Sequence, residues 1–117
     1  MLRTRHIELS DGIERLVVVS DLHAFIEPLE ALDEILAGFS GKVQVVSAGD
    51  CLIGGGNPAE TVEWVRSHAG ECAVRGNTEA TVLEKHRDKV SAPRSAEPPY
   101  ADGFRELNPG QLEYLRG

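Results

Sequence analysis

Residues 17–25, VVVSDLHAF, decide the fold of this chain. The three valines are β-branched and apolar, as is typical of a strand. The run ends at Ser20, and Asp21, one apolar residue and His23 come after it. A buried strand has no structural need for a carboxylate and an imidazole two residues apart at its end, whereas a site built on that strand needs both. The stretch therefore predicts a strand that carries a polar site at its carboxyl end.

Helix and strand patterns alternate on both sides of this stretch. The apolar run at 15–20 predicts a strand that is covered on both faces, and the turn signal at 10–12 predicts a hairpin before it. Apolar residues at helical spacing, with proline near the start and glycine after the end, predict helices. The further elements expected in chain order are a helix over 28–39, a strand over 42–50, a helix over 57–70, a strand over 71–77, a helix over 79–88 and a short helix over 108–117.

The order of these elements predicts an α/β fold, a layered sheet built from right-handed βαβ units. At 117 residues the chain has the length of one domain. After Val90 the sequence becomes rich in proline, serine and alanine, which predicts a loop. We therefore expect residues 1–90 to form the body of the domain, and residues 91–117 to add that loop and the terminal helix.

The composition is that of an ordinary globular protein, with 41% hydrophobic and 26% charged residues. The net charge of -7, from 12 Lys and Arg against 19 Asp and Glu, disfavours sequence-independent binding of nucleic acid, because phosphate contacts require cations. The sequence contains no long apolar run and no secretion signal, so we expect a cytoplasmic protein without membrane contact. The two cysteines lack the spacing of a disulfide framework or a metal site, which fits reduced thiols.

Metal-compatible side chains occur at the ends of all three expected strands. Asp21 and His23 end the first strand and, two residues apart in an extended chain, face the same way. Asp50 ends the second strand and Asn77 the third, each directly after a glycine. Ligands of an open parallel sheet bind beyond the carboxyl ends of its strands. A set of carboxylate, imidazole and amide oxygen predicts a site for Mn, Fe or Zn rather than a thiolate site.

Each of these residues also has an ordinary structural explanation. An aspartate at a strand end is often the N-cap of the next helix, a single histidine is often structural, and Gly-Asn is a common turn. Arg75, just before the third motif, fits a solvent-facing strand residue as well as a phosphate contact. What favours a site is the occurrence of these polar residues at three successive strand ends.

The three motifs resemble those of the calcineurin-like metallophosphoesterase family, and in particular its small bacterial phosphodiesterase branch. The DxH of the family is present as SDLH at 20–23, its GD as Gly49-Asp50, and its GNH followed by an acid as RGNTE at 75–79. A helix is expected between each pair of motifs, as in the family. The resemblance begins near Glu14 and implies the N-terminal half of the family's α/β sandwich.

The resemblance implies a hydrolase that cleaves a phosphomonoester or a phosphodiester, in a small molecule or a nucleotide. Asp21 and His23 would hold the first of two divalent metal ions (Mn, Fe, Zn or similar), and Asp50 would bridge both ions. Asn77 would bind the second ion and lie close to the phosphoryl oxygens. Asp50 and Asn77 would thus be the catalytic residues, and Asn77, Arg75 and Thr78 the phosphate-binding residues. Two ions about 3.5–4 Å apart would activate a hydroxide for in-line attack on phosphorus.

The chain departs from the family at two points. Thr78 stands where the family usually has the histidine that protonates the leaving group, and a hydroxyl is a poor general acid near neutrality. The second half of the family's domain, with its GH and GHxH histidines, is missing from this sequence. The resemblance therefore implies a partial form, either a fragment that lacks its C-terminal half or a short form that pairs with another chain, for instance as a homo-oligomer. A partial form is expected to leave a strand edge and an apolar face uncovered.

Two other functions remain open. A non-catalytic remnant of the same fold, one that binds metal or phosphate or that oligomerises, would also carry these motifs. A different doubly wound domain, such as a dinucleotide binder or a receiver-like domain, is disfavoured, because no GxGxxG follows the first strand and because His23 rather than a second acid accompanies Asp21.

Overall fold

Two parallel strands form the centre of the structure, a computed structural model that describes residues 5–89 and 107–116. β1 (Ile13–Val19) pairs with β2 (Lys42–Ser47), with Val17 opposite Val45. The helices are α1 (Glu27–Ala37), α2 (Pro58–His68), α3 (Asn77–Lys89) and α5 (Pro109–Arg116). The predicted fold class, an α/β fold with parallel strands and intervening helices, is confirmed.

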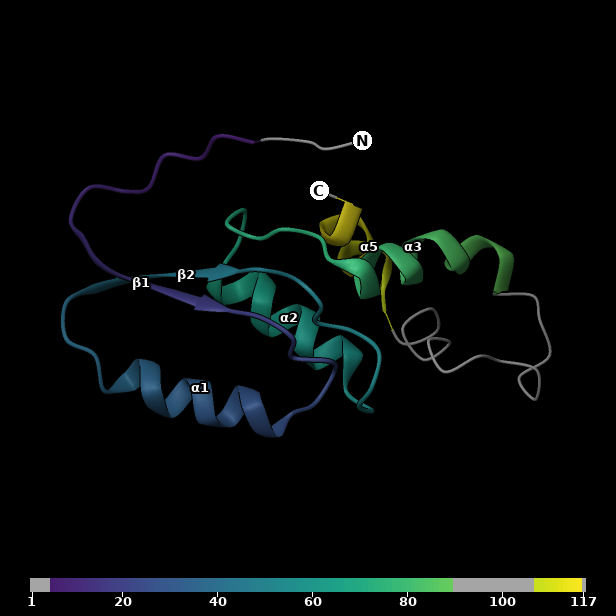
Figure 1. Cartoon of the computed structure of the whole chain (residues 1–117), viewed down its shortest axis with the longest axis horizontal. Helices are drawn as coiled ribbons and strands as arrows, with labels where there is room; N and C mark the ends of the chain where they lie inside the picture. The colour runs from purple at the N-terminus through teal and green to yellow at the C-terminus, as the bar shows by residue number, and fades with distance from the viewer. Residues whose placement is uncertain (1–4, 90–106, 117) are drawn as a thin grey trace.

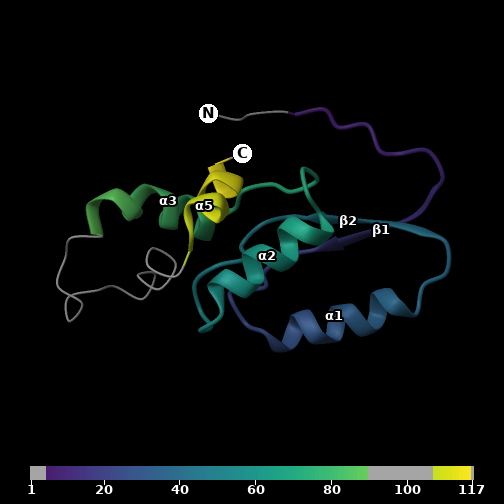
Figure 2. The same ribbon diagram turned by 180° about the vertical axis from the view of Figure 1, so that it is seen from behind.

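Helices α1 and α2 pack on the buried face of the sheet. Figure 1 shows the strands in front of α2, and Figure 2, seen from behind, shows α2 in front of the strands. Leu29 of α1 and Val62 of α2 belong to one buried cluster with Val19 and Val45 of the strands. The same cluster continues into α3 and α5. Removal of this apolar surface from water is the main stabilising contribution, at about 25 cal/mol per Å².

The opposite face of β1 is exposed. Side chains alternate along a strand, and Leu16 and Val18 are 56% and 65% exposed, whereas Val19, which points into the core, is only 6% exposed. Among the described residues no helix lies over this face (Figure 1). The prediction that this strand is covered on both faces is therefore wrong for the described part of the chain. The uncovered apolar face expected of a partial form is confirmed.

The helix ends follow the signals in the sequence, with one difference in detail. α2 begins after Asn57 as predicted, but the Asn57 side chain makes no capping hydrogen bond. The Asn57 carbonyl oxygen instead accepts hydrogen bonds from the backbone N–H and the hydroxyl of Thr61. α5 has a complete capping box, in which Asn108 Oδ1 accepts from Gln111 N at 2.8 Å and Gln111 Oε1 accepts from Asn108 N at 2.9 Å.

The hairpin predicted before β1 is wrong. Residues 5–10 form no strand, and within the described residues β1 pairs with β2 alone. The turn at Asp11 and Gly12 is present, but the segment before it leads away from the sheet (Figure 1). The Arg5 guanidinium donates to the carbonyl oxygen of Glu71 instead. This long-range contact takes the place of pairing along β1.

The third strand predicted over 71–77 is reduced to a single parallel bridge. Ser47 N donates to Cys72 O and Val74 N donates to Ser47 O, both at 2.9 Å, so that Ala73 pairs with Ser47. Ser47 is the last residue of β2, and α3 already begins at Asn77. The segment therefore passes only the end of β2, which is too short a path for a ladder. It still brings the start of α3 to the carboxyl edge of the sheet.

The terminal helix predicted for the end of the chain is present as α5, whereas the loop predicted over 91–103 lies outside the described residues. The Tyr114 hydroxyl donates to Gly70 O at 2.6 Å, and Gln111 Nε2 donates to Ala59 O at 3.3 Å. These bonds hold α5 against α2 and the turn that comes after it. None of the helices that the structure describes has the length and apolar character that a membrane crossing requires.

Two leucines compare the core with the outer face of β1, one in the loop after β2 and one on the exposed face of the strand. Leu52 is fully buried, so Leu52→Ala should lower the free energy of unfolding by about 2–5 kcal/mol through lost burial and a cavity. Leu16→Ala, at an exposed position of β1, should change it by less than about 0.5 kcal/mol. Urea unfolding followed by Trp64 fluorescence measures both. An equal loss for the two variants would mean that the outer face of β1 is covered in solution.

Candidate active site at the strand ends

The loops after β1 and β2 lie side by side at the carboxyl edge of the sheet. Asp21 N donates to Gly49 O at 3.0 Å and His23 N donates to Asp50 O at 3.2 Å. Ala24 N donates to Cys51 O, at 2.6 Å. The pairing of the strands thus continues as backbone hydrogen bonds between the loops. These main-chain contacts bring two of the three sequence motifs together.

The backbone of both loops is unusual. Among the residues that the structure describes, five non-glycine residues have a positive φ, between 50° and 66°, and all of them belong to these two loops: Asp21, His23, Ala24, Asp50 and Ile53. Non-glycine residues rarely adopt this left-handed region, and each instance has a free-energy cost of about 1–3 kcal/mol. Such conformations persist where surrounding contacts fix them, and they are most frequent at functional sites.

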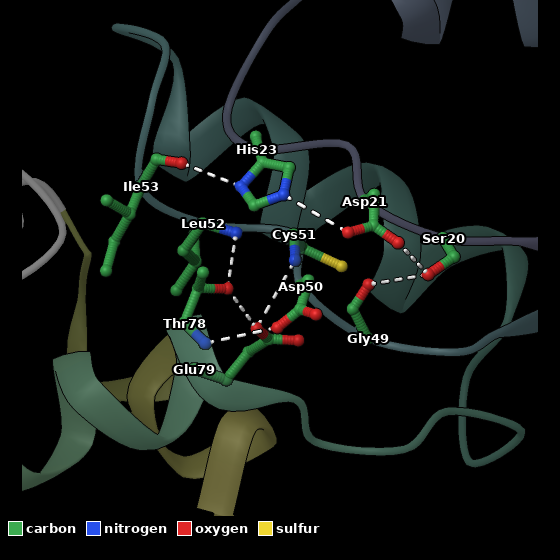
Figure 3. A network of polar contacts seen from close by, with 10 residues as sticks. All are labelled: Ser20, Asp21, His23, Gly49, Asp50, Cys51, Leu52, Ile53, Thr78 and Glu79. Carbon is green, nitrogen blue, oxygen red and sulfur yellow. Dashed lines mark hydrogen bonds and ion pairs between the residues drawn. The ribbon is translucent and has the colours of Figure 1, made fainter.

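Asp21 and His23 form a facing pair at the centre of this edge (Figure 3). His23 Nε2 lies 3.3 Å from Asp21 Oδ1, and His23 Nδ1 lies 2.9 Å from the carbonyl oxygen of Ile53. The Ser20 hydroxyl donates to the other carboxylate oxygen, Oδ2 of Asp21, at 2.6 Å. Both side chains remain accessible, with 63% of Asp21 and 37% of His23 exposed. Hydrogen bonds to Ser20 and Ile53 therefore orient the carboxylate and the imidazole, and both groups remain accessible to solvent.

These contacts shift the two pKa values in opposite directions. The pKa of His23 is raised above 6.5, chiefly by its hydrogen bond to the Ile53 carbonyl and further by Asp21, against an opposing effect of burial. The pKa of Asp21 is lowered below 3.8, chiefly by the Ser20 hydroxyl and then by His23. Both shifts favour the charged forms of the pair.

The same pair fits a divalent cation. The Ile53 carbonyl only accepts hydrogen bonds, so His23 Nδ1 carries a hydrogen, and the neutral ring directs the lone pair of Nε2 at Asp21 Oδ1. Two acceptors 3.3 Å apart repel each other unless a proton or a cation lies between them. Two ligands that each lie about 2.1 Å from a tetrahedral ion are about 3.4 Å apart. A backbone carbonyl behind the imidazole is also a common partner of a metal-binding histidine.

A third donor is not part of this pair as it stands. Within residues 5–89 and 107–116, no group of three or more His, Cys, Asp and Glu side chains is arranged to hold a metal ion. Asp50 lies in the adjacent loop, and its Oδ1 accepts a hydrogen bond from Thr78 N at 3.2 Å, at the start of α3. One of its two carboxylate oxygens is therefore committed to the N-terminus of α3.

The third motif reaches the site through α3 rather than through a strand. Asn77 is the first residue of α3, and both Asn77 and Arg75 are exposed. Gly76 between them packs directly against Asp50, because a Cβ at Gly76 would lie only 2.7 Å from Asp50 N. The structure thus brings Asp21 and His23 together, holds Asp50 beside them through the backbone, and places Asn77 and Arg75 on the neighbouring segment.

Thr78 and Glu79 contact the loop after β2. The Thr78 hydroxyl donates to Glu79 Oε2 at 2.5 Å and accepts from Leu52 N at 3.2 Å (Figure 3). Glu79 Oε2 also accepts from Cys51 N at 3.3 Å, and Glu79 is only 2% exposed.

Two residues of this edge were not among the site residues predicted from sequence. Glu79 contacts the loop of Asp50, and Ser20 holds the carboxylate of Asp21. Both leave a signal in the sequence, since Glu79 is an acid in the first turn of a helix and Ser20 is the first polar residue after an apolar strand. The contact of the Ile53 carbonyl with His23 has no signal in the sequence, because every residue has a main-chain carbonyl.

The glycines at 54–56 allow the loop after β2 to fold over His23. Gly55 N donates to His23 O at 2.7 Å, and Asn57 N donates to Ala24 O at 2.8 Å. A Cβ at Gly55 would lie 2.7 Å from the carbonyl carbon of Ala24, which is closer than any ordinary contact. Gly54 and Gly55 therefore permit close approach to the histidine loop.

Comparisons with known proteins agree with this arrangement. The calcineurin-like phosphoesterase superfamily domain matches residues 15–105 of the chain. The structure is similar to that of a metallophosphoesterase from Sphaerobacter thermophilus, with a TM-score of 0.68 and 30% sequence identity. The match covers 86% of this chain but only 39% of that protein, so this chain spans well under half of its length. A comparison with curated proteins gives no match.

Adjacent glycines test the contact between the two loops. Gly55→Ala should lower the free energy of unfolding by about 1–3 kcal/mol and shift the NMR signals of His23, because the added Cβ displaces the backbone at Ala24. Gly56→Ala is the matched control, since no atom lies within 4 Å of a Cβ at that position. Urea unfolding and an amide correlation spectrum measure both variants. Unchanged His23 signals in Gly55→Ala would contradict the packing described.

The protonation of His23 gives a second test, in protein freed of metal by a chelator. NMR titration of the ring should give a pKa above 6.5, and Asp21→Asn should lower that pKa. Because the folded-state pKa is raised, protonation of His23 stabilises the fold below pH 6.5, and this contribution is lost as the pH rises through the folded-state pKa. An identical pKa in the protein and in Asp21→Asn would show that the carboxylate does not act on the imidazole.

Proposed function

Because the chain belongs to the calcineurin-like phosphoesterase superfamily, we propose that it is a metal-dependent phosphoesterase that hydrolyses a phosphomonoester or a phosphodiester. The observation that carries the proposal is the Asp21–His23 pair. Its nitrogen and oxygen face each other at 3.3 Å at the carboxyl edge of the sheet, with the Ile53 carbonyl behind the ring. His68 and Asp33 form a similar pair, with 3.6 Å between Nε2 and Oδ1, but the backbone bond from His23 N to Asp50 O places the Asp21–His23 pair next to the loop of a further carboxylate.

The proposed roles of the site residues rest on their positions. Asp21 and His23 would hold one divalent ion, such as Mn, Fe or Zn, and Asp50 would bridge to a second. Asn77, exposed at the start of α3, would bind that second ion and stand next to the phosphoryl group. A bound divalent ion would supply Lewis acidity that activates water and neutralises charge on the phosphoryl oxygens.

The phosphate would be oriented by residues of the segment that leads into α3. Arg75 is exposed directly before Gly76, which packs against Asp50, and a guanidinium suits bidentate contact with a phosphate. Asn77 and the N-terminus of α3 lie at the same edge of the sheet. Thr78 was also predicted as a phosphate contact, and this stays a prediction, although its hydroxyl already bonds Glu79 and Leu52 N.

The substrate and the assembly of the complete protein are further parts of the proposal. We propose a small-molecule phosphoester or a nucleotide as substrate. We also propose that residues 1–90 are the phosphoesterase-like half-domain and that residues 91–117 belong to the same domain, since α5 packs against α2. The similar metallophosphoesterase is more than twice as long, and the uncovered face of β1 is consistent with a missing half or a homo-oligomer.

A non-catalytic metal- or phosphate-binding module is the second candidate function. The observation that favours it is that the Thr78 hydroxyl is already hydrogen-bonded to Glu79. Thr78 stands at the position of the family's usual histidine and has no group that titrates near neutrality. In addition, only a pair of donors, rather than three, is in place among the described residues. Tight binding of one Mn²⁺ without any turnover would identify this function.

Hydrolysis of p-nitrophenyl phosphate and bis(p-nitrophenyl) phosphate with added Mn²⁺ tests the phosphoesterase. Asp50→Asn should slow Mn²⁺-dependent turnover at least about tenfold, because it removes a charged metal ligand. Asp11→Asn is the matched control at an exposed turn and should leave the rate unchanged. If the two variants and the unaltered protein hydrolyse both esters at the same rate, the proposed function is wrong.

A further inference from the structure

We propose that Thr78 and Glu79 are positioning residues: together they clamp the loop after β2 to α3 and, through that loop, fix the orientation of His23 and Asp50. The inference rests on the proposed function for its chemical meaning. It goes beyond that function by assigning the threonine at the family's histidine position a role in building the metal site.

The clamp consists of three hydrogen bonds. They join the consecutive loop residues 50–52 to Thr78 and Glu79 of α3. Thr78 N donates to Asp50 Oδ1 at 3.2 Å, Glu79 Oε2 accepts from Cys51 N at 3.3 Å, and the Thr78 hydroxyl accepts from Leu52 N at 3.2 Å. The Thr78 hydroxyl also donates to Glu79 Oε2 at 2.5 Å, which ties the two halves of the clamp together. Figure 3 shows these four contacts as one connected network.

The loop held by this clamp also forms hydrogen bonds with His23 and Ala24. Asp50 O accepts from His23 N, Cys51 O accepts from Ala24 N, and Ile53 O lies 2.9 Å from His23 Nδ1. The same four-residue stretch is therefore bonded to α3 on one side and to the histidine loop on the other. A change in the position of this stretch moves the imidazole and the Asp50 carboxylate together.

Burial makes the clamp rigid. Glu79 is 2% exposed, and Leu52 and Val82 are fully buried. A buried carboxylate requires hydrogen-bond donors, and here a backbone N–H and a hydroxyl provide them. Glu79 also lies in the first turn of α3, where the helix dipole favours a negative charge. These contacts hold the positive-φ backbone of Asp50 and Ile53 in place.

The hydroxyl hydrogen of Thr78 is used within this network. A threonine hydroxyl has one hydrogen, and it points to Glu79, while Leu52 N occupies one of its lone pairs. A hydroxyl bonded in this way acts on the metal ligands through the loop. Direct donation to a phosphate would require breaking its bond to Glu79. The two roles therefore predict different responses to removal of the hydroxyl.

The test uses the full chain and two substitutions of similar size. Thr78→Val removes the hydroxyl, and Thr78→Ser retains it. In metal-free protein, Thr78→Val should speed hydrogen exchange at Leu52 N about tenfold, with faster exchange also at Cys51, His23 and Ala24. Calorimetry with Mn²⁺ alone should show about tenfold weaker binding. Thr78→Ser should restore both properties.

Thr81→Val is the matched control, because the Thr81 hydroxyl donates only to the carbonyl of Asn77 within the same helix. It should change neither exchange at the loop nor Mn²⁺ affinity. Glu79→Gln is a second variant for the case in which Thr78→Val does not fold. It should speed exchange at Cys51 N and weaken Mn²⁺ binding, since the charge-assisted bond is lost.

Two results would overturn the proposal. Faster exchange confined to Leu52 would mean that the clamp does not reach His23. Unchanged exchange and Mn²⁺ affinity in Thr78→Val, with weaker inhibition of hydrolysis by inorganic phosphate, would make Thr78 a direct phosphate contact. If the unaltered protein binds no Mn²⁺, the proposed function fails, and the exchange measurements in metal-free protein still decide whether the clamp holds the histidine loop.

Discussion

The hydrogen bonds between the backbones of the loops after β1 and β2 are the constraint on which the rest of this structure depends. Asp21 N to Gly49 O and His23 N to Asp50 O continue the parallel pairing beyond the last strand residues. Because these bonds use main-chain atoms, they place two sequence motifs side by side whatever their side chains are. The left-handed conformations of Asp21, His23 and Asp50 then turn the side chains out of the sheet. The arrangement of these polar side chains at one edge is thus a consequence of strand pairing.

The side chains of the candidate site are oriented by groups outside the predicted ligand set. The imidazole of His23 is oriented by a carbonyl 30 residues away in the chain, and the carboxylate of Asp21 by the adjacent Ser20 hydroxyl. Glycines at 55 and 76 allow the backbones to approach closely enough for these contacts. Main-chain packing and side-chain hydrogen bonds therefore act together to orient these two groups.

In the described part of the chain, the core lies on one face of the sheet only. The helices cover one face of the two strands, while Leu16 and Val18 stay exposed on the other. The candidate site at the carboxyl edge consists of the loops after the strands and the start of α3, and its hydrogen bonds do not involve the exposed side chains of β1. The similar metallophosphoesterase, of which this chain matches 39%, shows that the same part of the fold also occurs within a much longer protein.

The sequence by itself determined the helices, the two paired strands and the family motifs, because these depend on local periodicity, on caps such as Asn108 and Gln111, and on residue types at strand ends. It could not reveal that residues 71–77 would form one bridge instead of a strand, or that residues 5–10 would leave the sheet, because both depend on which distant segment competes for the same hydrogen bonds. Only the tertiary structure decided that Ile53 O would orient His23 and that Glu79 would be buried against Cys51 N. Main-chain contacts between distant loops do not depend on a pattern of residue types. They can therefore be seen only in the folded structure.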